Sequence, residues 1–185
     1  MLWHLYHLFV QRRESHAPTK HIMMCHAVLM LIESIAKDSK LLKKDLWEDF
    51  LKFFLAINDA VLAPPFNKDD FGEVLSSRIV ATLFEIWLIA CNKVFPSPAL
   101  WRTFQELCGN WRHHISLVVE WTRVCVALTH RLLELTWWPE QTSPRNVSSN
   151  DTNVSYDIQT IISLMNTETV SQSWFRFFHV IGKEI

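Results

Sequence analysis

The apolar residues of this sequence recur at helical spacing along almost its whole length, which limits the chain to helical folds. Apolar positions that step by three and four residues form one stripe on an α-helix. One such stripe contains Trp47, Phe50, Phe54, Ile57 and Val61. No segment shows the alternation of apolar and polar residues that is typical of a half-buried strand. The sequence therefore predicts an all-α fold.

Capping signals, prolines and a glycine divide the periodic pattern into separate helices. Asp45 followed by Glu48 is close to a capping box, which predicts a helix that begins at Asp45 and ends before Pro64-Pro65. Ser97-Pro98 predicts the start of another helix, and Gly109 predicts its end. After an apolar segment at 2–10, the predicted helices are 20–37, 45–63, 70–94, 98–109, 114–138, 158–165 and 169–181.

Two further helices each have apolar positions at helical spacing. In the helix at 20–37, the apolar positions at helical spacing are Val28, Leu31, Ile32 and Ile35. In the long helix at 114–138, the predicted stripe consists of Val118, Trp121, Cys125, Leu128, Leu132 and Leu135.

The helix at 70–94 has an apolar band that is wide enough for burial on two sides. Leu75 and Leu83 mark one face, and Val80 and Phe84 mark the adjacent face. Short links between consecutive helices favour antiparallel packing. These features predict an α-solenoid of the HEAT or armadillo kind, which is a stack of antiparallel helix pairs. A closed helical bundle is the alternative.

A change of composition divides the chain into three parts. From 139 to 157, Thr, Ser, Asn, Asp and Pro dominate, and large apolar residues nearly vanish. We therefore predict a helical array over 1–138 and a polar loop over 139–157. Residues 158–185 are expected to form the last helices of the array, which is cut at its C-terminus.

The charge and cysteine content of the chain narrow the class of protein. The net charge is −1, with 18 basic and 19 acidic residues, whereas a nucleic-acid binder normally has a basic excess. Uninterrupted apolar runs are far shorter than the roughly 20 residues that span a bilayer. The four cysteines lie in apolar helical patterns without a CxxC pair, as is typical of free thiols in a reducing compartment. We expect a cytoplasmic protein with no transmembrane segment and no nucleic-acid partner.

The first candidate for chemistry is a group of possible zinc ligands in one helix. His21 and Cys25 are four residues apart, and His26 is adjacent. A structural zinc ion needs four ligands, and no second close pair completes the set. We therefore interpret these residues as polar positions of a half-buried helix and predict no metal site.

Histidines near 113 and evenly spaced tryptophans are the other candidates. His113 and His114 lack the oriented partner that a general base needs, so we interpret them as capping and packing residues. Trp101, Trp111 and Trp121 recur every ten residues, each followed closely by an arginine, as in a platform that stacks nucleobases. The neutral charge and the apolar surroundings favour burial of these tryptophans. We predict no catalytic residue and no cofactor-binding residue.

Four stretches of the sequence carry motifs that occur together, in the same order and at similar spacing, in one protein family. They are 54–65 (FLAINDAVLAPP), 83–91 (LFEIWLIAC) with Phe95-Pro96, 110–114 (NWRHH) with Val118-Val119, and 173–177 (SWFRF). In these motifs the chain resembles the N-terminal region of the beta subunits of Ral GTPase-activating protein complexes. The resemblance spans nearly the whole chain. Ile115 stands where we expect a proline, the segment 140–157 differs in composition, and family members are much longer.

The resemblance implies a role without chemistry. Such a beta subunit is similar to a scaffold that pairs with a catalytic alpha subunit, which stimulates GTP hydrolysis by Ral-type small GTPases. The catalytic asparagine of these complexes lies in a separate domain of the alpha subunit, and no residue here matches that motif. We therefore expect a non-catalytic, regulatory piece of the complex. A generic HEAT-like interaction adaptor is the first alternative, and direct GTPase activation by this chain is the second.

Overall fold

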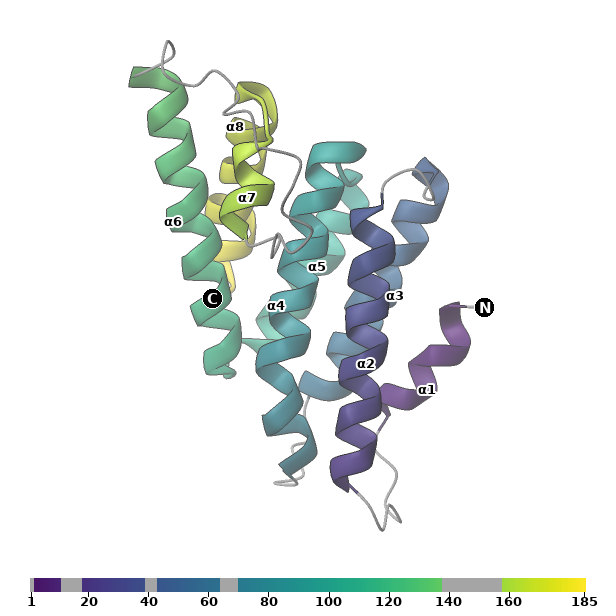
Figure 1. Ribbon diagram of the computed structural model, residues 1–185. Helices are drawn as coiled ribbons and strands as arrows, with labels where there is room; N and C mark the ends of the chain where they lie inside the picture. The colour runs from purple at the N-terminus through teal and green to yellow at the C-terminus, as the bar shows by residue number, and fades with distance from the viewer. Residues whose placement is uncertain (1, 11–17, 39–42, 64–69, 138–157) are drawn as a thin grey trace.

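The computed structural model describes residues 2–10, 18–38, 43–63, 70–137 and 158–185 (Figure 1). The regular structure of these residues is entirely helical, which confirms the all-α prediction. The polar loop predicted at 139–157 lies outside the described residues.

The helices follow the predicted order closely. Two short elements, η1 (Leu2–Leu5) and α1 (Tyr6–Phe9), form the N-terminal segment. The long helices are α2 (Pro18–Lys37), α3 (Lys44–Leu62), α4 (Asp70–Lys93), α5 (Pro98–Trp111) and α6 (Ile115–Trp137). The C-terminal elements are α7 (Ile158–Ser163), α8 (Thr167–Phe175), the π-helical turn η3 (Arg176–Val180) and the 3₁₀ turn η4 (Ile181–Lys183).

The start of α3 differs from the predicted capping box. Lys43 occupies the N-cap position, and no side chain caps the helix. Asp45 lies inside the first turn, where its negative charge is favourable beside the positive end of the helix dipole. The N-cap lies two residues before the predicted one, and the backbone N–H of Trp47 donates to the carbonyl of Lys43 at 3.1 Å. The prediction of Asp45 as the cap was wrong.

The end of α5 also differs from the prediction, which placed it at Gly109. The helix continues to Trp111, and no described glycine has a positive φ. Gly109 instead allows a close approach, since a Cβ atom there would lie 3.1 Å from Glu184 Oε2. At the other end of α5, Ser97 is the N-cap and Pro98 follows it as predicted, but the Ser97 side chain makes no capping hydrogen bond.

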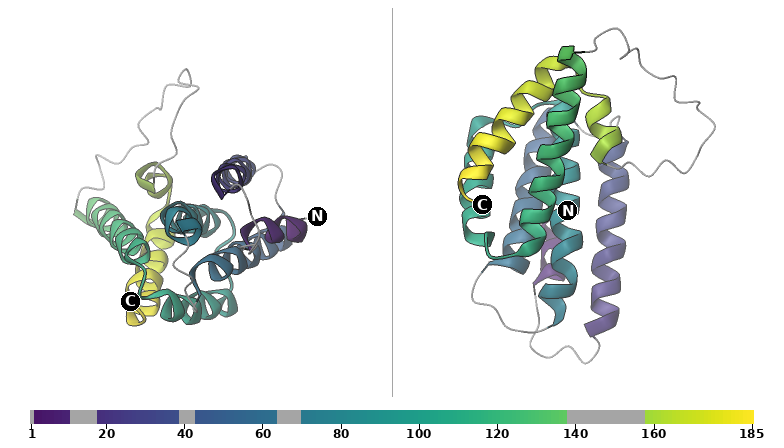
Figure 2. Two further views of the ribbon diagram at one scale, coloured as in Figure 1. Left: turned by 90° about the horizontal axis from the view of Figure 1, so that it is seen from below. Right: turned by 90° about the vertical axis from the view of Figure 1, so that its left-hand side faces the viewer.

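The helices lie in two rows (Figure 2, left). In one row α4 lies between α2 and α6 and contacts both. In the other row α1 contacts α3, α3 contacts α5, and α5 contacts η3. Between the rows, α4 packs on α3 and α6 packs on α8, while α7 contacts both α4 and α6. Helix α4 is therefore surrounded by more elements than any helix at an end of a row.

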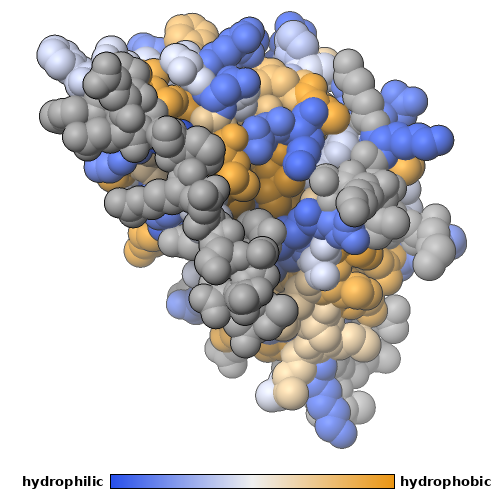
Figure 3. Space-filling view, turned by 45° about the horizontal axis from the view of Figure 1, so that its top comes forward, coloured by the Kyte–Doolittle hydropathy of each residue, from blue (hydrophilic) through white to orange (hydrophobic). Residues whose placement is uncertain are grey.

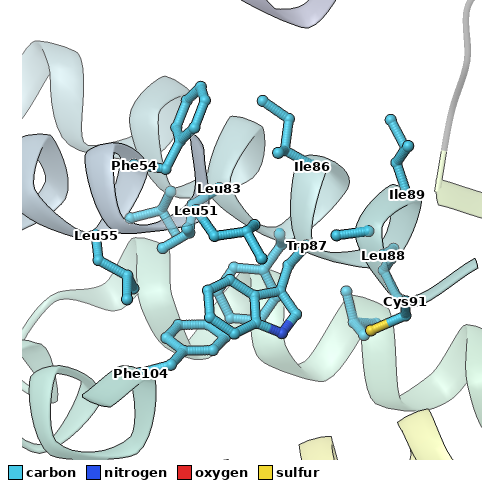
Figure 4. Close-up of a cluster of buried hydrophobic side chains, with 14 of the residues drawn as sticks. Leu51, Phe54, Leu55, Leu83, Ile86, Trp87, Leu88, Ile89, Cys91 and Phe104 are labelled. Atoms are coloured by element: carbon cyan, nitrogen blue, oxygen red, sulfur yellow. The ribbon is translucent and has the colours of Figure 1, made fainter. Parts of the chain in front are cut away.

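The hydrophobic core is centred on α4 (Figure 4). The Trp87 ring of α4 lies beside the Phe104 ring of α5, with ring centroids 4.4 Å apart. Phe177 of η3 packs edge-on against Trp101, at 5.2 Å, and ties the C-terminal turn to the same cluster. These aromatic rings are fully buried, so their contacts hold both rows together.

Among the described helices, two are long and apolar enough to cross a membrane by length and composition, although neither is an uninterrupted apolar run. They are Thr19–Lys37 and Gly72–Lys93. In the second, 72% of the most apolar window is buried, so core packing accounts for its composition. In the first only 28% is buried, which leaves an apolar surface on α2.

Candidate interaction surfaces

The evenly spaced tryptophans are structural. Trp101 and Trp111 are fully buried and cannot stack on a nucleobase. The indole N–H of Trp111 donates to Asp59 Oδ1 at 3.0 Å, which joins the end of α5 to the end of α3. The indole N–H of Trp121 donates to the carbonyl of Phe177 at 2.9 Å, which joins α6 to η3. The interpretation of these residues as packing residues is confirmed.

Two of the three residues considered for zinc, His21 and Cys25, contact the same backbone carbonyl. His21 Nε2 donates to the carbonyl of Leu8 at 2.6 Å, and Cys25 Sγ donates to the same oxygen at 3.3 Å. Burial raises the pKa of Cys25 to about 11, which disfavours the thiolate that a metal would need. This pair therefore anchors α2 on the short N-terminal helix. In the described part of the chain, no group of three or more His, Cys, Asp or Glu side chains could hold a metal ion.

The two histidines at the turn before α6 pack against each other, with ring centroids 4.5 Å apart. His114 Nε2 donates to the carbonyl of Leu62, the last residue of α3, at 3.0 Å. Burial lowers the pKa of His114 despite this hydrogen bond, which favours the charged form, and the neighbouring His113 lowers it further. His114 is thus a neutral packing residue, whereas Arg112 beside it is exposed.

Burial also makes the remaining cysteines unreactive. It raises the pKa of Cys91 and of Cys125 to about 12 in each case, and it raises that of Cys108 as well. All four cysteines are free thiols. Because the thiolate is the nucleophilic form, none of these side chains is suited to attack a substrate.

A polar cluster joins α2 to α4, and sequence reasoning missed it. Glu33 is buried, and both of its carboxylate oxygens lie 2.7 Å from Arg78 Nη2. The Thr82 hydroxyl donates to Glu33 Oε1 at 2.6 Å. Burial and the nearby Glu33 raise the pKa of Glu85, against the opposing effect of basic side chains such as Lys37. The cluster orients the two helices, and its paired charges suit a structural role better than a catalytic one.

An apolar stripe on α2 faces away from the protein. It is called the α2 stripe here and consists of residues at successive turns of the helix: Met23, Met24, Ala27, Met30 and Leu31. Met23, Met30 and Leu31 are 66%, 64% and 60% exposed. Leu31 belongs to the apolar positions at helical spacing in this helix but is exposed, because Cys25, Leu29 and Ile32 form the face that packs. Methionine-rich surfaces are adaptable and are used for binding other proteins.

A second apolar stripe runs the full length of α6. This α6 stripe consists of Ile115, Val119, Val126, Leu133 and Trp137, which are 79%, 54%, 62%, 49% and 70% exposed. The face of α6 that packs contains most of the predicted stripe, including buried Cys125 and Leu128. Only Val118 of that predicted set is exposed. Sequence could have indicated the outer stripe, because both faces of this helix are rich in apolar residues.

Aromatic side chains are also exposed near the C-terminus. Phe175 and Phe178 reach the surface at the π-helical turn, and Phe178 stacks on Trp174 with ring centroids 5.1 Å apart. In the space-filling view, orange apolar residues reach the surface in several places between blue polar ones (Figure 3). Apolar surface of this extent is typical of proteins that bind other proteins.

Comparison with known proteins identifies relatives of this chain. The chain is 38% identical over all of its 185 residues to the Ral GTPase-activating protein subunit beta of Mus musculus and, equally, to that of Homo sapiens. It is 28% identical over 120 residues, 63% of the chain, to the Ral GTPase-activating protein subunit alpha-2 of Mus musculus, of which the match covers 6%.

The chain spans 12% of the length of the beta subunits that it matches. No solved structure matches it significantly. The family described as the RALGAPB N-terminal domain matches residues 18–138, which contain helices α2 to α6 and both apolar stripes. This chain therefore belongs to the RALGAPB N-terminal domain family.

Proposed function

We propose that this chain is a non-catalytic scaffold piece of the beta subunit of a Ral GTPase-activating complex. It supports assembly with a catalytic alpha subunit and so the stimulation of GTP hydrolysis by Ral-type small GTPases. The observation that carries the proposal is the pair of exposed apolar stripes, one on α2 and one on α6, in a member of this family.

The position of the stripes supports a stacked architecture. Helix α4 occupies the middle of its row and is covered on both sides by α2 and α6. The α2 and α6 stripes lie on the outer sides of the two helices that flank α4, where an α-solenoid accepts further helices. We therefore propose that the two rows are a segment of an α-solenoid and that its open faces bind neighbouring helices.

The size of the stripes supports protein binding as their use. Burial of apolar surface contributes about 25 cal/mol per Å², so five half-exposed side chains contribute several kcal/mol when a partner covers them. The similarity to an alpha-2 subunit over 120 residues adds a second argument. If both subunits carry a related helical segment, the complex can form between surfaces of the same kind.

The internal contacts support a role without chemistry. His21, His114 and Glu33 are each held in contacts between helices, and all four cysteines are buried. We propose that the chain works in the cytoplasm, where its four free thiols would remain reduced.

Co-purification tests the assembly function. The chain, shown to be folded by its helical circular dichroism and cooperative melting, is mixed with an alpha subunit and passed over a size-exclusion column. We expect one complex, and a Met23→Lys plus Met30→Lys variant, which adds two charges to the exposed α2 stripe, is expected to bind more weakly. Separate elution of the folded wild-type chain and the alpha subunit would contradict the proposal.

Single-turnover hydrolysis of GTP by Ral tests the non-catalytic part. We expect no acceleration when the chain is added alone, because none of its described side chains forms a catalytic arrangement. An alpha subunit serves as the positive control in the same assay. A dose-dependent acceleration by the chain alone would favour the alternative of direct GTPase activation.

A further inference from the structure

The α6 stripe has the length and spacing of a helix-pairing surface. Val126 lies at its centre, and Val119 and Leu133 lie seven positions to either side. Ile115 and Trp137 lie eleven positions before and after Val126. A seven-residue apolar repeat is the pattern by which two helices pack at a shallow angle along their full length.

The threonines along the α6 stripe do not oppose its burial. The hydroxyl groups of Thr122 and Thr136 donate to carbonyls of their own helix, those of Val118 and Leu132, at 2.8 and 2.7 Å. These threonines need no further donor contact and can present their methyl groups. The stripe can therefore be buried with its threonine donors already satisfied.

We propose that the α6 stripe binds a second copy of this chain, with the two α6 helices antiparallel about a two-fold axis at Val126. In this arrangement Val126 contacts Val126 of the second copy, and Val119 faces Leu133. At each end of the paired helices, Ile115 of one copy faces the larger Trp137 of the other. Such an interface goes beyond assembly with an alpha subunit, because it needs only this chain.

The length of the α6 stripe distinguishes it from the α2 stripe. From Ile115 to Trp137 it extends about 33 Å, at 1.5 Å per residue, whereas the α2 stripe extends only about 12 Å from Met23 to Leu31. Two α6 stripes together bury on the order of 1,000 Å², near the lower limit for a specific interface. The dimer is therefore weak, with a dissociation constant of about 1–100 µM.

The fold leaves α6 accessible for this contact. In the right-hand view of Figure 2, α6 lies at the front of the described residues, with α8 on one side of it and α7 on the other. Arg123 and His130 are the charged or titratable residues nearest the centre of the α6 stripe, three and four positions from Val126, and in the antiparallel pair His130 faces Thr122. Arg123 faces Thr129, so neither residue opposes a like charge across the axis.

Sedimentation equilibrium of the intact chain and two charge variants tests the proposal. We expect a reversible dimer for the wild type and at least about tenfold weaker self-association for Val126→Glu and Val126→Lys, because each places like charges on the axis. An equimolar mixture of the two variants is expected to form a heterodimer, since a two-fold axis brings residue 126 against itself. Val126 is exposed in the single chain, so both variants keep its fold.

The matched control is Met30→Lys, which adds a charge to the exposed α2 stripe and is expected to leave the dimer unchanged. Val126→Cys is expected to form a covalent dimer under mild oxidation, and the native cysteines, all buried, do not compete.

Four results would overturn the proposal. They are a wild-type chain that stays monomeric above about 100 µM, Val126 variants that dimerise like the wild type, mixed charge variants that stay monomeric, and loss of the dimer in Met30→Lys. Binding of an alpha subunit to the α6 stripe of a monomeric chain would likewise assign the surface to that partner. It would leave the proposed assembly function intact.

Discussion

Replacement of Glu33 by alanine tests how α2 is held on α4. Glu33 is 7% exposed, and its carboxylate accepts hydrogen bonds from Thr82, which is fully buried, and from Arg78. A hydrogen bond to a charged acceptor contributes about 1.5–3 kcal/mol, whereas an ion pair with a partly exposed arginine contributes about 0.2–1 kcal/mol. Relief of the carboxylate's desolvation offsets part of this loss.

We therefore expect Glu33→Ala to lower the free energy of unfolding by about 2 kcal/mol. For a chain of this size the melting temperature falls by about 4–8 °C. Urea unfolding followed by tryptophan fluorescence measures the loss. Thr82→Val supplies the second arm of a double-mutant cycle, in which we expect a coupling energy of at least about 0.5 kcal/mol.

A loss of stability in Glu33→Ala would come from the lost hydrogen bonds of the carboxylate. It would not come from helix propensity, because alanine is the best helix former. A loss below about 0.5 kcal/mol, or additive effects of the two substitutions, would refute the view that this contact stabilises the α2–α4 junction. Ser34→Ala, at the next and exposed position of α2, is the matched control and should be nearly neutral.

Three further predictions concern the core, the polar cluster between α2 and α4, and the C-terminal turn. Trp87→Ala is expected to lower stability by about 3–5 kcal/mol, because it empties a fully buried site against Phe104, and calorimetry should show it. Glu85→Gln is expected to raise stability at pH 7, because the raised pKa of Glu85 means that its ionised form destabilises the folded state. This gain should shrink as the pH falls through the folded-state pKa and vanish below the unfolded value of 4.5, and a gain independent of pH would contradict it. Gly182→Ala is expected to cost about 1–3 kcal/mol in urea unfolding, since its Cβ would lie 2.9 Å from Trp121 Cζ2. An unchanged midpoint would show that the turn moves without strain.

Helix boundaries illustrate how local signals compete with tertiary contacts. The Ser97-Pro98 start of α5 depends on backbone geometry that proline imposes, so it could be predicted. Gly109 was predicted to end that helix, yet its lack of a side chain serves the approach of Glu184, which is distant in sequence. A glycine has several uses, and only the position of the C-terminal segment shows which one applies.

The polar contacts also depend on residues that are distant in sequence, so local patterns could not predict them. The four-residue spacing of His21 and Cys25 made them candidate zinc ligands. The carbonyl that both side chains contact belongs to Leu8 of another helix, and spacing within one helix cannot show this contact. Glu33 and Thr82 are 49 residues apart, and the sequence around either residue does not indicate their contact. Whether a charged side chain such as Glu33 is buried depends on which helices pack against each other.

The sequence by itself determined that the chain is helical, where most helices lie, and which family its motifs resemble. These properties depend on local periodicity, on prolines and on short motifs, all of which involve residues close together in the sequence. Tertiary structure alone decided which apolar face of each helix is buried, because both faces of α2 and α6 are apolar enough to pack. Burial goes to the face that meets a neighbouring helix, and the remaining face stays exposed as the surface on which the proposed interactions depend.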